Sequence, residues 1–238
     1  MNGLAFLNQI NMTFPDPERA LVDPNGLLAV GGDLQPQRLL TAYYNGIFPW
    51  FNQDDPILWW SPDPRAIFEL DDVHISRSLR KTIKRRQFYV TINQDFEHVI
   101  RQCAVPRAKQ AGTWITQDII NAYCQLHTLG RAHSIEVRHT SDDQLVGGLY
   151  GINVGQIFCG ESMFHIQADA SKIAFVALIN HLKKYHYKLI DAQIDNPYLQ
   201  SLGSKQLTRT EFLCRLRHKR DILLDKNCWL PQEIEIGI

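Results

Sequence analysis

The sequence lacks the features of a secreted, membrane-spanning or zinc-binding protein. Its 238 residues include five cysteines, an odd number, and no two of them have Cys-x-x-Cys spacing, which argues against a disulfide framework and a zinc site. No stretch approaches the roughly 18 apolar residues of a membrane span. The N-terminus lacks the basic start and uninterrupted apolar run of a signal peptide. We therefore expect a soluble, cytoplasmic protein with no membrane partner.

A net charge is missing as well, because 25 Lys and Arg residues balance 25 Asp and Glu residues. No global field attracts nucleic acid, so such a partner has to bind a local patch. Ser76 is placed to cap a helix that runs to about Arg86, and five basic residues share one face of this helix. They are Arg77, Arg80, Lys81, Lys84 and Arg85.

This basic helix has no acidic residue between Ser76 and Gln87 to relieve the repulsion. Each like-charge pair at this spacing destabilises a helix by roughly a few tenths of a kcal/mol. A run of charges is often only a solvated face, but uncompensated repulsion in a chain without net charge favours a phosphate-binding surface. Ile75, Leu79 and Ile83 form a separate apolar stripe that would anchor the helix.

The chain is long enough for one large or two small domains. Its composition changes near residue 65, and we predict a small N-terminal domain, residues 1–65, and a second domain, residues 66–238, with the boundary between 62 and 70. Trp50, Trp59 and Trp60 give the first part three of the five tryptophans within eleven residues. Trp59 and Trp60 are typical of a small aromatic core, whereas Trp50 lies in a proline-bounded loop, where a ring can stack on a base.

The second part has the pattern of an α+β fold. Three β runs, His133–Thr140, Leu145–Gly151 and Gln156–Phe164, predict an antiparallel meander. Between Ala168 and Tyr185 apolar residues recur on all sides at helical spacing, which predicts a buried helix. A short strand, Tyr187–Gln193, follows it. Caps and terminators predict further helices at 36–45, 95–103, 117–129, 197–202 and 208–219.

Two acids and an amide are predicted to meet at one rim of this sheet. Asp191 and Gln193 lie two residues apart at the end of a strand, so they project from the same face if the strand persists. Glu161 follows Gly160 at the exit of an earlier strand. From the residues alone, a capped strand end for Asp191 and a loop acid for Glu161 are equally good interpretations.

The chain resembles the bacterial leucyl/phenylalanyl-tRNA–protein transferases from about residue 14 to 213. The residues that carry the resemblance are Pro24–Ala29, Gly31–Leu34, Gly46–Phe51, Trp59–Arg65, His74–Ser78, Gly112–Thr116, His133–Val137, Phe158–Phe164 and Leu189–Asp191. The resemblance implies a small N-terminal domain beside a domain with an N-acetyltransferase-like fold, a mainly antiparallel sheet and packed helices. It also implies transfer of Leu, Phe or Met from an aminoacyl-tRNA to the α-amino group of a protein that begins with Arg or Lys, which marks that protein for degradation through the N-end rule.

The resemblance also assigns roles to individual residues. It places Asp191, Gln193 and Glu161 at the catalytic centre. It also implies that the basic helix binds the acceptor stem of the tRNA. It implies a pocket for the aminoacyl group and the terminal adenosine, formed by Tyr43, Trp50, Trp114, Tyr123, Leu149, Phe158, Leu178 and Asn196. Leu149 and Leu178 stand where the family more often has Met and Phe, which leaves the preference between Leu and Phe open. No cofactor or metal is implied, and a monomer is expected.

The implied reaction needs positioning more than a strong base. The aminoacyl ester is already activated, and an α-amine with a pKa near 7.7 to 8.0 is about a tenth neutral at pH 7. Holding the reactants together can supply on the order of 7 to 11 kcal/mol. Our hypothesis is that Asp191 holds the amine and accepts or relays its proton, while Gln193 orients it. In the family, the position of Gln193 has been given the role of accepting the amine proton, but an amide is a poor base. A ribose hydroxyl of the tRNA is an alternative group to carry this proton. Glu161 either recognises the basic side chain of the acceptor or organises the pocket.

Three other interpretations remain. Cys159, with His165 nearby in sequence, would be a thiol nucleophile. A coenzyme A-dependent N-acetyltransferase of the same fold would need a glycine-containing pyrophosphate loop, and none lies between Phe164 and Ala168. A non-catalytic tRNA-binding module would use the basic helix but leaves the acids unexplained. The glycines at 147, 148, 151 and 155 precede no Lys-Ser or Lys-Thr and are typical of bends and close packing.

Overall fold

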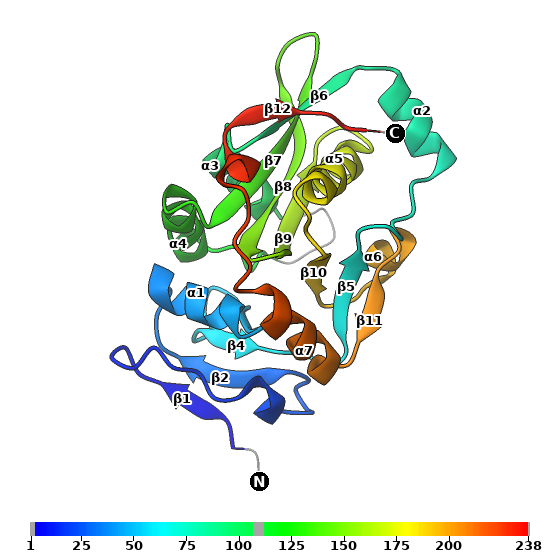
Figure 1. Ribbon diagram of the computed structural model, residues 1–238. Coiled ribbons are helices and arrows are strands. Elements are labelled where there is room, and N and C mark those ends of the chain that lie inside the picture. Colours follow the sequence, from blue (N-terminus) through cyan, green and yellow to red (C-terminus); the bar gives the residue numbers. More distant parts are fainter. Residues whose placement is uncertain (1–2, 107–111, 238) are drawn as a thin grey trace.

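The computed structural model describes residues 3–106 and 112–237, and these residues form two sheets (Figure 1). The smaller sheet has the strand order β1 (Ala5–Leu7), β2 (Leu27–Gly31), β4 (Leu58–Trp60), β3 (Phe48–Pro49). Helix α1 (Pro36–Tyr44) and a 3-10 turn (Pro17–Arg19) accompany it. Trp59 is fully buried here, which agrees with the core predicted for this aromatic segment.

The larger sheet has eight strands in the described residues. Their order is β11 (Lys205–Leu207), β5 (Arg65–Glu69), β10 (Leu189–Gln193), β9 (Ile157–His165), β8 (Leu145–Val154), β7 (Ala132–His139), β6 (Phe88–Ile92), β12 (Gln232–Ile234). Within it, β10 and β9 are parallel, and the other described neighbours are antiparallel. The meander β7–β8–β9 and the mainly antiparallel α+β architecture predicted from the sequence are confirmed.

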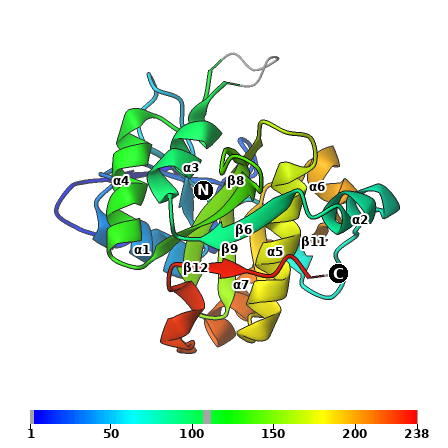
Figure 2. The same cartoon turned by 90° about the horizontal axis from the view of Figure 1, so that it is seen from above.

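Helices cover both faces of the larger sheet (Figure 2). Helix α5 (Ala170–Lys184) is buried almost all round, as predicted, and packs on one face together with α2 (Arg77–Lys84). Helices α3 (Phe96–Ala104) and α4 (Gln117–Thr128) pack on the other face. Among the described residues, no helix combines the length and the apolar character needed to cross a bilayer.

Four of the predicted helix starts are confirmed by side-chain caps. The side chains of Ser76, Thr116, Asn196 and Thr208 each accept a hydrogen bond from a backbone N–H in the first turn of α2, α4, α6 (Pro197–Ser201) and α7 (Arg209–Lys219). In α7 the side chain of Glu211 accepts the reciprocal bond from the Thr208 N–H at 3.0 Å, which completes a capping box.

Close packing between β8 and β9 depends on a glycine. A Cβ atom at Gly151 would lie 2.2 Å from the carbonyl oxygen of Cys159 and 2.6 Å from the ring of Phe158. The same is true where α5 begins, since a Cβ at Gly147 would lie 2.5 Å from that of Ala170. These glycines serve close packing, as the sequence indicated, and Gly151 leaves room for the ring of Phe158 on the neighbouring strand.

Helix α7 connects the two parts of the molecule (Figure 1). Its Phe212, Leu213 and Leu216 are buried in a core cluster that also contains Ile47 and Phe48 of the N-terminal part. The contact is tight, because a Cβ at Gly46 would lie 2.6 Å from the side chain of Leu213. The core is therefore continuous from the small sheet to the face of the large sheet that α3 and α4 cover.

Candidate active site

A cavity of about 480 Å³ opens where β10 ends beside the middle of β9, between α5 and the N-terminal aromatic residues. Its wall is largely apolar and includes Phe48, Phe68 and Phe175, with Glu161 and Gln193 among its polar groups. Six of the eight pocket residues implied by the resemblance line it: Trp50, Trp114, Leu149, Phe158, Leu178 and Asn196. Trp50 is 43% exposed and makes a T-shaped contact with Trp60, so part of its side chain is open to solvent at the rim.

The other two implied pocket residues, Tyr43 and Tyr123, lie beneath Glu161 and do not line the cavity. Both are buried, and their hydroxyl groups are hydrogen-bonded to each other. The Tyr123 hydroxyl also donates to Glu161 Oε2 at 3.3 Å. These tyrosines therefore act on the cavity through the Glu161 carboxyl group.

Asp191 is held in a buried ion pair with Arg65. The Arg65 Nε donates to Oδ1 and its Nη2 donates to Oδ2, both at 2.8 Å, and each side chain is only 1% exposed. The guanidinium lies between the rings of Phe48 and Phe212, 4.9 and 4.6 Å from their centroids. Two charges so far from water are tolerated only when they are paired in this way.

Gln193 joins the two carboxyl groups. Its backbone N–H donates to Asp191 Oδ1 at 3.0 Å, and its side-chain Nε2 donates to Glu161 Oε1 at 2.9 Å. This geometry requires a bulge, because the β10–β5 register shifts between Asp191 and Gln193 and Gln193 has φ +64°. The regular strand assumed from the sequence does not persist. Asp191 consequently lies below the cavity, while Gln193 lies on its wall.

The Glu161 carboxyl is poised to exchange a proton near neutral pH. Burial, the largest influence, and the nearby charge of Asp191 raise its pKa to about 7, although hydrogen bonds from Tyr43, Gln193 and Tyr123 act in the opposite direction. Burial of this kind disfavours the ionised form. A carboxyl group with such a pKa on a cavity wall is a candidate general base.

Cys159 does not have the surroundings of a nucleophile. Burial, followed by the charges of Asp191 and Glu161, raises the pKa of its thiol well above the usual value, so the reactive thiolate is disfavoured. His165 lies at the other end of β9, where its ring nitrogen approaches the hydroxyl of Ser171 at 3.4 Å. The interpretation as a thiol enzyme is therefore not supported.

Arg65 is a residue of this site that the sequence analysis did not single out. It opens β5, whose next three residues, Ala66, Ile67 and Phe68, are all buried. A charged residue at the head of a buried strand needs a buried partner of opposite charge, and this signal was present in the sequence. The sequence did not indicate which residue is the partner, because Asp191 is 126 residues away in the chain.

Helix α2 presents its basic residues to solvent, as predicted. Arg77, Arg80, Lys81, Lys84 and Arg85 are all exposed, and within the described part of the chain none of them is in an ion pair. Leu79 is buried, and Ile75 and Ile83 pack against the core. The helix also contacts the start of α5, where the Thr82 hydroxyl donates to Asp169 at 3.3 Å.

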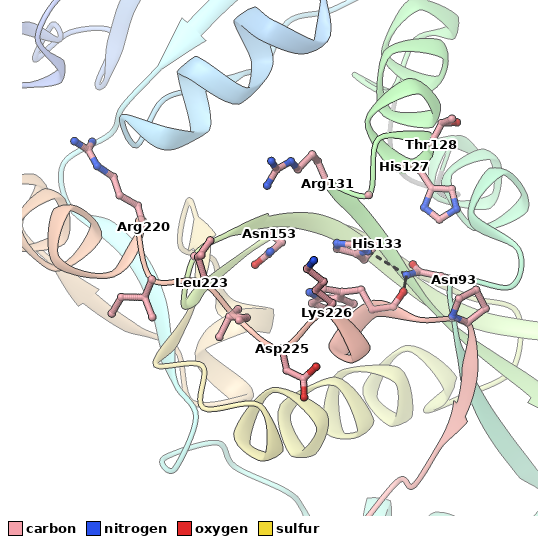
Figure 3. A pocket seen from close by; sticks show the side chains of 16 residues that line it. Asn93, His127, Thr128, Arg131, His133, Asn153, Arg220, Leu223, Asp225 and Lys226 are labelled. Atoms are coloured by element: carbon pink, nitrogen blue, oxygen red, sulfur yellow. Dashed lines mark hydrogen bonds between the residues drawn. The ribbon is translucent and has the colours of Figure 1, made fainter.

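A larger cavity, of about 710 Å³, lies elsewhere (Figure 3). Its described lining includes neither Glu161 nor Asp191 nor Gln193. Because the proton-exchanging groups and the aromatic rim surround the smaller cavity, that cavity is the candidate active site.

Comparison with known proteins identifies the family. The model of the leucyl/phenylalanyl-tRNA protein transferases matches residues 67–217, and the model of their N-terminal domain matches residues 32–63. The chain belongs to the leucyl/phenylalanyl-tRNA–protein transferase family. A member from Shewanella piezotolerans is 59% identical, and one from Shewanella sp. strain ANA-3 is 58% identical, each over all of both chains. Membership of the transferase family confirms the resemblance and the prediction of an aminoacyltransferase.

Two solved structures are remotely similar to this chain. The L-PGS structure from Bacillus licheniformis is 14% identical, with a TM-score of 0.40 over 72% of this chain and 56% of that one. A GCN5-related N-acetyltransferase-like protein from Streptococcus suis is also 14% identical, with a TM-score of 0.29 over 79% of this chain and 61% of that one.

Proposed function

We propose that the protein transfers Leu, Phe or Met from an aminoacyl-tRNA to the α-amino group of a protein or peptide that begins with Arg or Lys, which tags the acceptor for N-end rule degradation. One observation carries the proposal. An apolar cavity of about 480 Å³ has on its wall a carboxyl group with a pKa of about 7, which is the group an amine needs as its proton acceptor.

The cavity suits an apolar aminoacyl group followed by a nucleoside. Leu149, Phe158 and Leu178 form an apolar wall for the side chain. An apolar pocket distinguishes side chains by only about 1 to 3 kcal/mol per methylene, so acceptance of Leu, Phe and Met together is reasonable. The partly exposed side chain of Trp50 at the rim is available for stacking on the terminal adenine.

In the proposed reaction Glu161 receives the proton. The amine nitrogen forms a bond to the ester carbonyl carbon, the bond between that carbon and the ribose oxygen breaks, and the amine proton passes to Glu161. The ribose oxygen leaves as a hydroxyl after it has taken up a proton, from Glu161 or through the neighbouring ribose hydroxyl. Gln193, fixed by its hydrogen bond to Glu161, orients the amine.

We assign Asp191 a different role from the one we inferred from its sequence position. Both of its oxygens already accept hydrogen bonds from Arg65, and Oδ1 also accepts one from Gln193. In this arrangement Asp191 positions Gln193 and raises the pKa of Glu161 by its charge. Direct contact of Asp191 with the amine would require the Arg65 pair to open.

The exposed basic face of α2 is proposed to bind the acceptor stem. Phosphate contacts by Lys and Arg supply much of the affinity of proteins for nucleic acid, and these side chains are free of ion pairs in the described part of the chain. The residues proposed for chemistry all lie around one cavity of one chain, so we propose that the protein acts as a monomer, in the cytoplasm, where aminoacyl-tRNA is available.

One assay tests the proposal. Labelled Leu-tRNA or labelled acetyl-coenzyme A is offered with a peptide that has Arg at its N-terminus, and a peptide with N-terminal Ala serves as the control. We expect product when Leu-tRNA is offered with the Arg peptide, and none when it is offered with the Ala peptide. Product from acetyl-coenzyme A would instead identify an N-acetyltransferase, and retention of tRNA without product would identify a binding module.

The structure gives no reason to prefer the acetyltransferase. The segment between β9 and α5, Ile166 to Asp169, contains no glycine. Asp169 stands at the N-terminal end of α5, where its negative charge would repel a pyrophosphate rather than attract it.

A further inference from the structure

The larger cavity, of about 710 Å³, contains no residue that the proposed transfer reaction uses. It lies where the ends of β6, β7 and β8 meet the C-terminal segment 220–231 (Figure 3). The strand ends contribute Asn93, Arg131, His133 and Asn153, and the C-terminal segment contributes Lys226. Arg131 and Lys226 are exposed, but His133 is buried, and a buried polar group costs free energy unless it is hydrogen-bonded.

His133 has a buried donor that no protein group satisfies. Its side chain is held by a stacked contact with Trp229, 4.0 Å between centroids, and the residue is only 3% exposed. Asn93 fixes the tautomer, because its Oδ1 accepts from the Ser134 N–H at 3.0 Å and its Nδ2 therefore donates to His133 Nδ1 at 3.1 Å. The proton then lies on Nε2, which is buried without a partner.

Further donors surround this N–H group. The Oδ1 atom of Asn153 accepts from the Tyr187 hydroxyl at 2.6 Å, so its Nδ2 remains as a donor on the wall. In Figure 3 the side chains of Arg131 and Lys226 extend into the space around His133 and Asn153. Burial lowers the pKa of His133 well below its usual value, which keeps the imidazole a neutral donor at neutral pH.

Two acceptors line the same wall. Asp225 brings a carboxylate, whose Oδ1 accepts from the backbone N–H of Asn227 at 2.9 Å, and the Nδ1–H of His127 donates to the Ala132 carbonyl at 2.9 Å, which leaves its Nε2 as an acceptor. The guanidinium of Arg220 turns away, since it donates to the Tyr44 carbonyl at 2.8 Å and stacks on the Tyr44 ring. The two cations, Arg131 and Lys226, and the donors of His133 and Asn153 outnumber these acceptors, so the wall favours a ligand that is negatively charged and rich in acceptor oxygens.

We propose that this cavity binds a small phosphate-bearing molecule, whose oxygens accept hydrogen bonds from His133 Nε2, Asn153 Nδ2, Arg131 and Lys226. A phosphate group offers several acceptor oxygens at once and forms strong charge-assisted bonds with Arg and Lys. The cavity has room for an organic part beside the apolar side chains of Leu224 and Pro231. The burial of His133 favours a small molecule over a nucleic-acid backbone.

The test is a titration of the full-length protein, labelled with nitrogen-15 in its histidines, first with inorganic phosphate and then with glycerol 3-phosphate. We expect a saturable shift of the His133 Nε2–H signal. Arg131→Gln and Lys226→Gln should each weaken binding about tenfold, and His133→Phe, which preserves the stacking on Trp229, should remove it. Arg19→Gln, a change at an exposed residue of the N-terminal part, should leave the affinity unchanged.

Comparison of the two ligands identifies the source of the phosphate. Tighter binding of glycerol 3-phosphate would show that the organic part is recognised, and equal affinities would identify free phosphate as the ligand. Absence of a saturable shift with both ligands, or unchanged affinity in Arg131→Gln and Lys226→Gln, would overturn the proposal. The two exposed substitutions decide the matter even if His133→Phe does not fold, and the outcome is independent of transferase activity.

Discussion

Among the described residues, Arg65 and Asp191 form the most deeply buried ion pair. Its two side chains are each 1% exposed, so the carboxylate depends on the guanidinium for its charge balance. Loss of one partner from such a pair leaves an uncompensated buried charge, which typically costs about 3 to 5 kcal/mol.

We therefore expect Arg65→Met to lower the free energy of unfolding by about 3 kcal/mol or more, measured by chemical denaturation at pH 7. The matched control is Arg215→Met. It breaks the exposed ion pair between Arg215 of α7 and Glu69, which lies on β5 like Arg65, and should lower the free energy of unfolding by only about 0 to 1 kcal/mol. A similar loss of unfolding free energy in the two variants would show that the buried pair stabilises the fold no more than the exposed pair does.

The pH dependence of transfer follows from the Glu161 carboxyl, whose pKa is about 7. Only the ionised form accepts a proton, and the acceptor amine, with a pKa near 7.7 to 8.0, must be neutral to attack. The single-turnover rate should therefore fall about tenfold per pH unit just below the amine pKa and about 100-fold per unit below pH 7, where both groups become protonated. Glu161→Gln should keep the tenfold slope throughout, and a wild-type profile that does not steepen near pH 7 would argue against Glu161 as the base.

Stability responds to the same group with the opposite sign. The raised pKa means that the folded state binds more protons than the unfolded chain between pH 4.5, the ordinary value for Glu, and about 7. Stability therefore declines as the pH rises through this window. Thermal melts at pH 5 and pH 8 should differ less for Glu161→Gln than for the wild type.

At the scale of elements, the two glycines that face each other in the β8–β9 pair should differ in how much stability is lost when each is replaced by alanine. Gly151 and Gly160 face each other across the two strands. A Cβ at Gly151 would lie 2.2 Å from a backbone oxygen, whereas one at Gly160 would lie 3.7 Å from Ile190, an ordinary contact. Gly151→Ala should lower the free energy of unfolding by about 2 kcal/mol or more and Gly160→Ala by less than about 1 kcal/mol. Denaturation curves with equal midpoints would contradict this reading of the packing.

Helix α2 makes a prediction about salt. Neutralising Arg80, Lys81 and Lys84 together as Gln should weaken tRNA binding and reduce the slope of log affinity against log salt by about 2 to 3. The rate of transfer from saturating aminoacyl-tRNA should stay near that of the wild type. The control changes three exposed basic residues elsewhere, Arg19, Lys188 and Arg217, and an equal loss of slope there would mean that α2 is not the binding surface.

On the scale of the whole molecule, the site is assembled from distant parts of the chain. Tyr43 and Tyr123 are 80 residues apart, and Arg65 and Asp191 are 126 apart. Phe212 of α7 contributes a ring to the Arg65 contact and is buried in the same core as Phe48. The division into residues 1–65 and 66–238 therefore remains a proposal about domains whose cores are joined through α7.

Local signals explain which elements the sequence could predict. The meander, α5 and the capped helices have periodicity or cap residues within a few positions, and each was found. The strands of the small sheet have only two to five residues, too few for alternation to be visible. Strand β6, Phe88–Ile92, has the right composition but was not identified.

The site was predicted in part for the same reason. The strand pattern placed Glu161 and Gln193 at one rim, and the resemblance to the transferase family implied the pocket residues, of which only Trp50, Trp114 and Phe158 lie in the motifs that carry the resemblance. The bulge at Gln193 carries no glycine to signal its φ of +64°, so the regular strand was assumed. The Arg65 pair and the tyrosines beneath Glu161 depend on contacts between remote segments, which no local pattern records.

The most direct test of the account compares two quantities in one variant. Single-turnover transfer of Leu from saturating Leu-tRNA to a peptide with N-terminal Arg, and the affinity for Leu-tRNA, are measured for the wild type and Glu161→Gln. The account predicts a rate that falls by about 100-fold, within the range contributed by general base catalysis, with an affinity that does not change. A rate within about twofold of the wild type, or equal losses in rate and affinity, would contradict it.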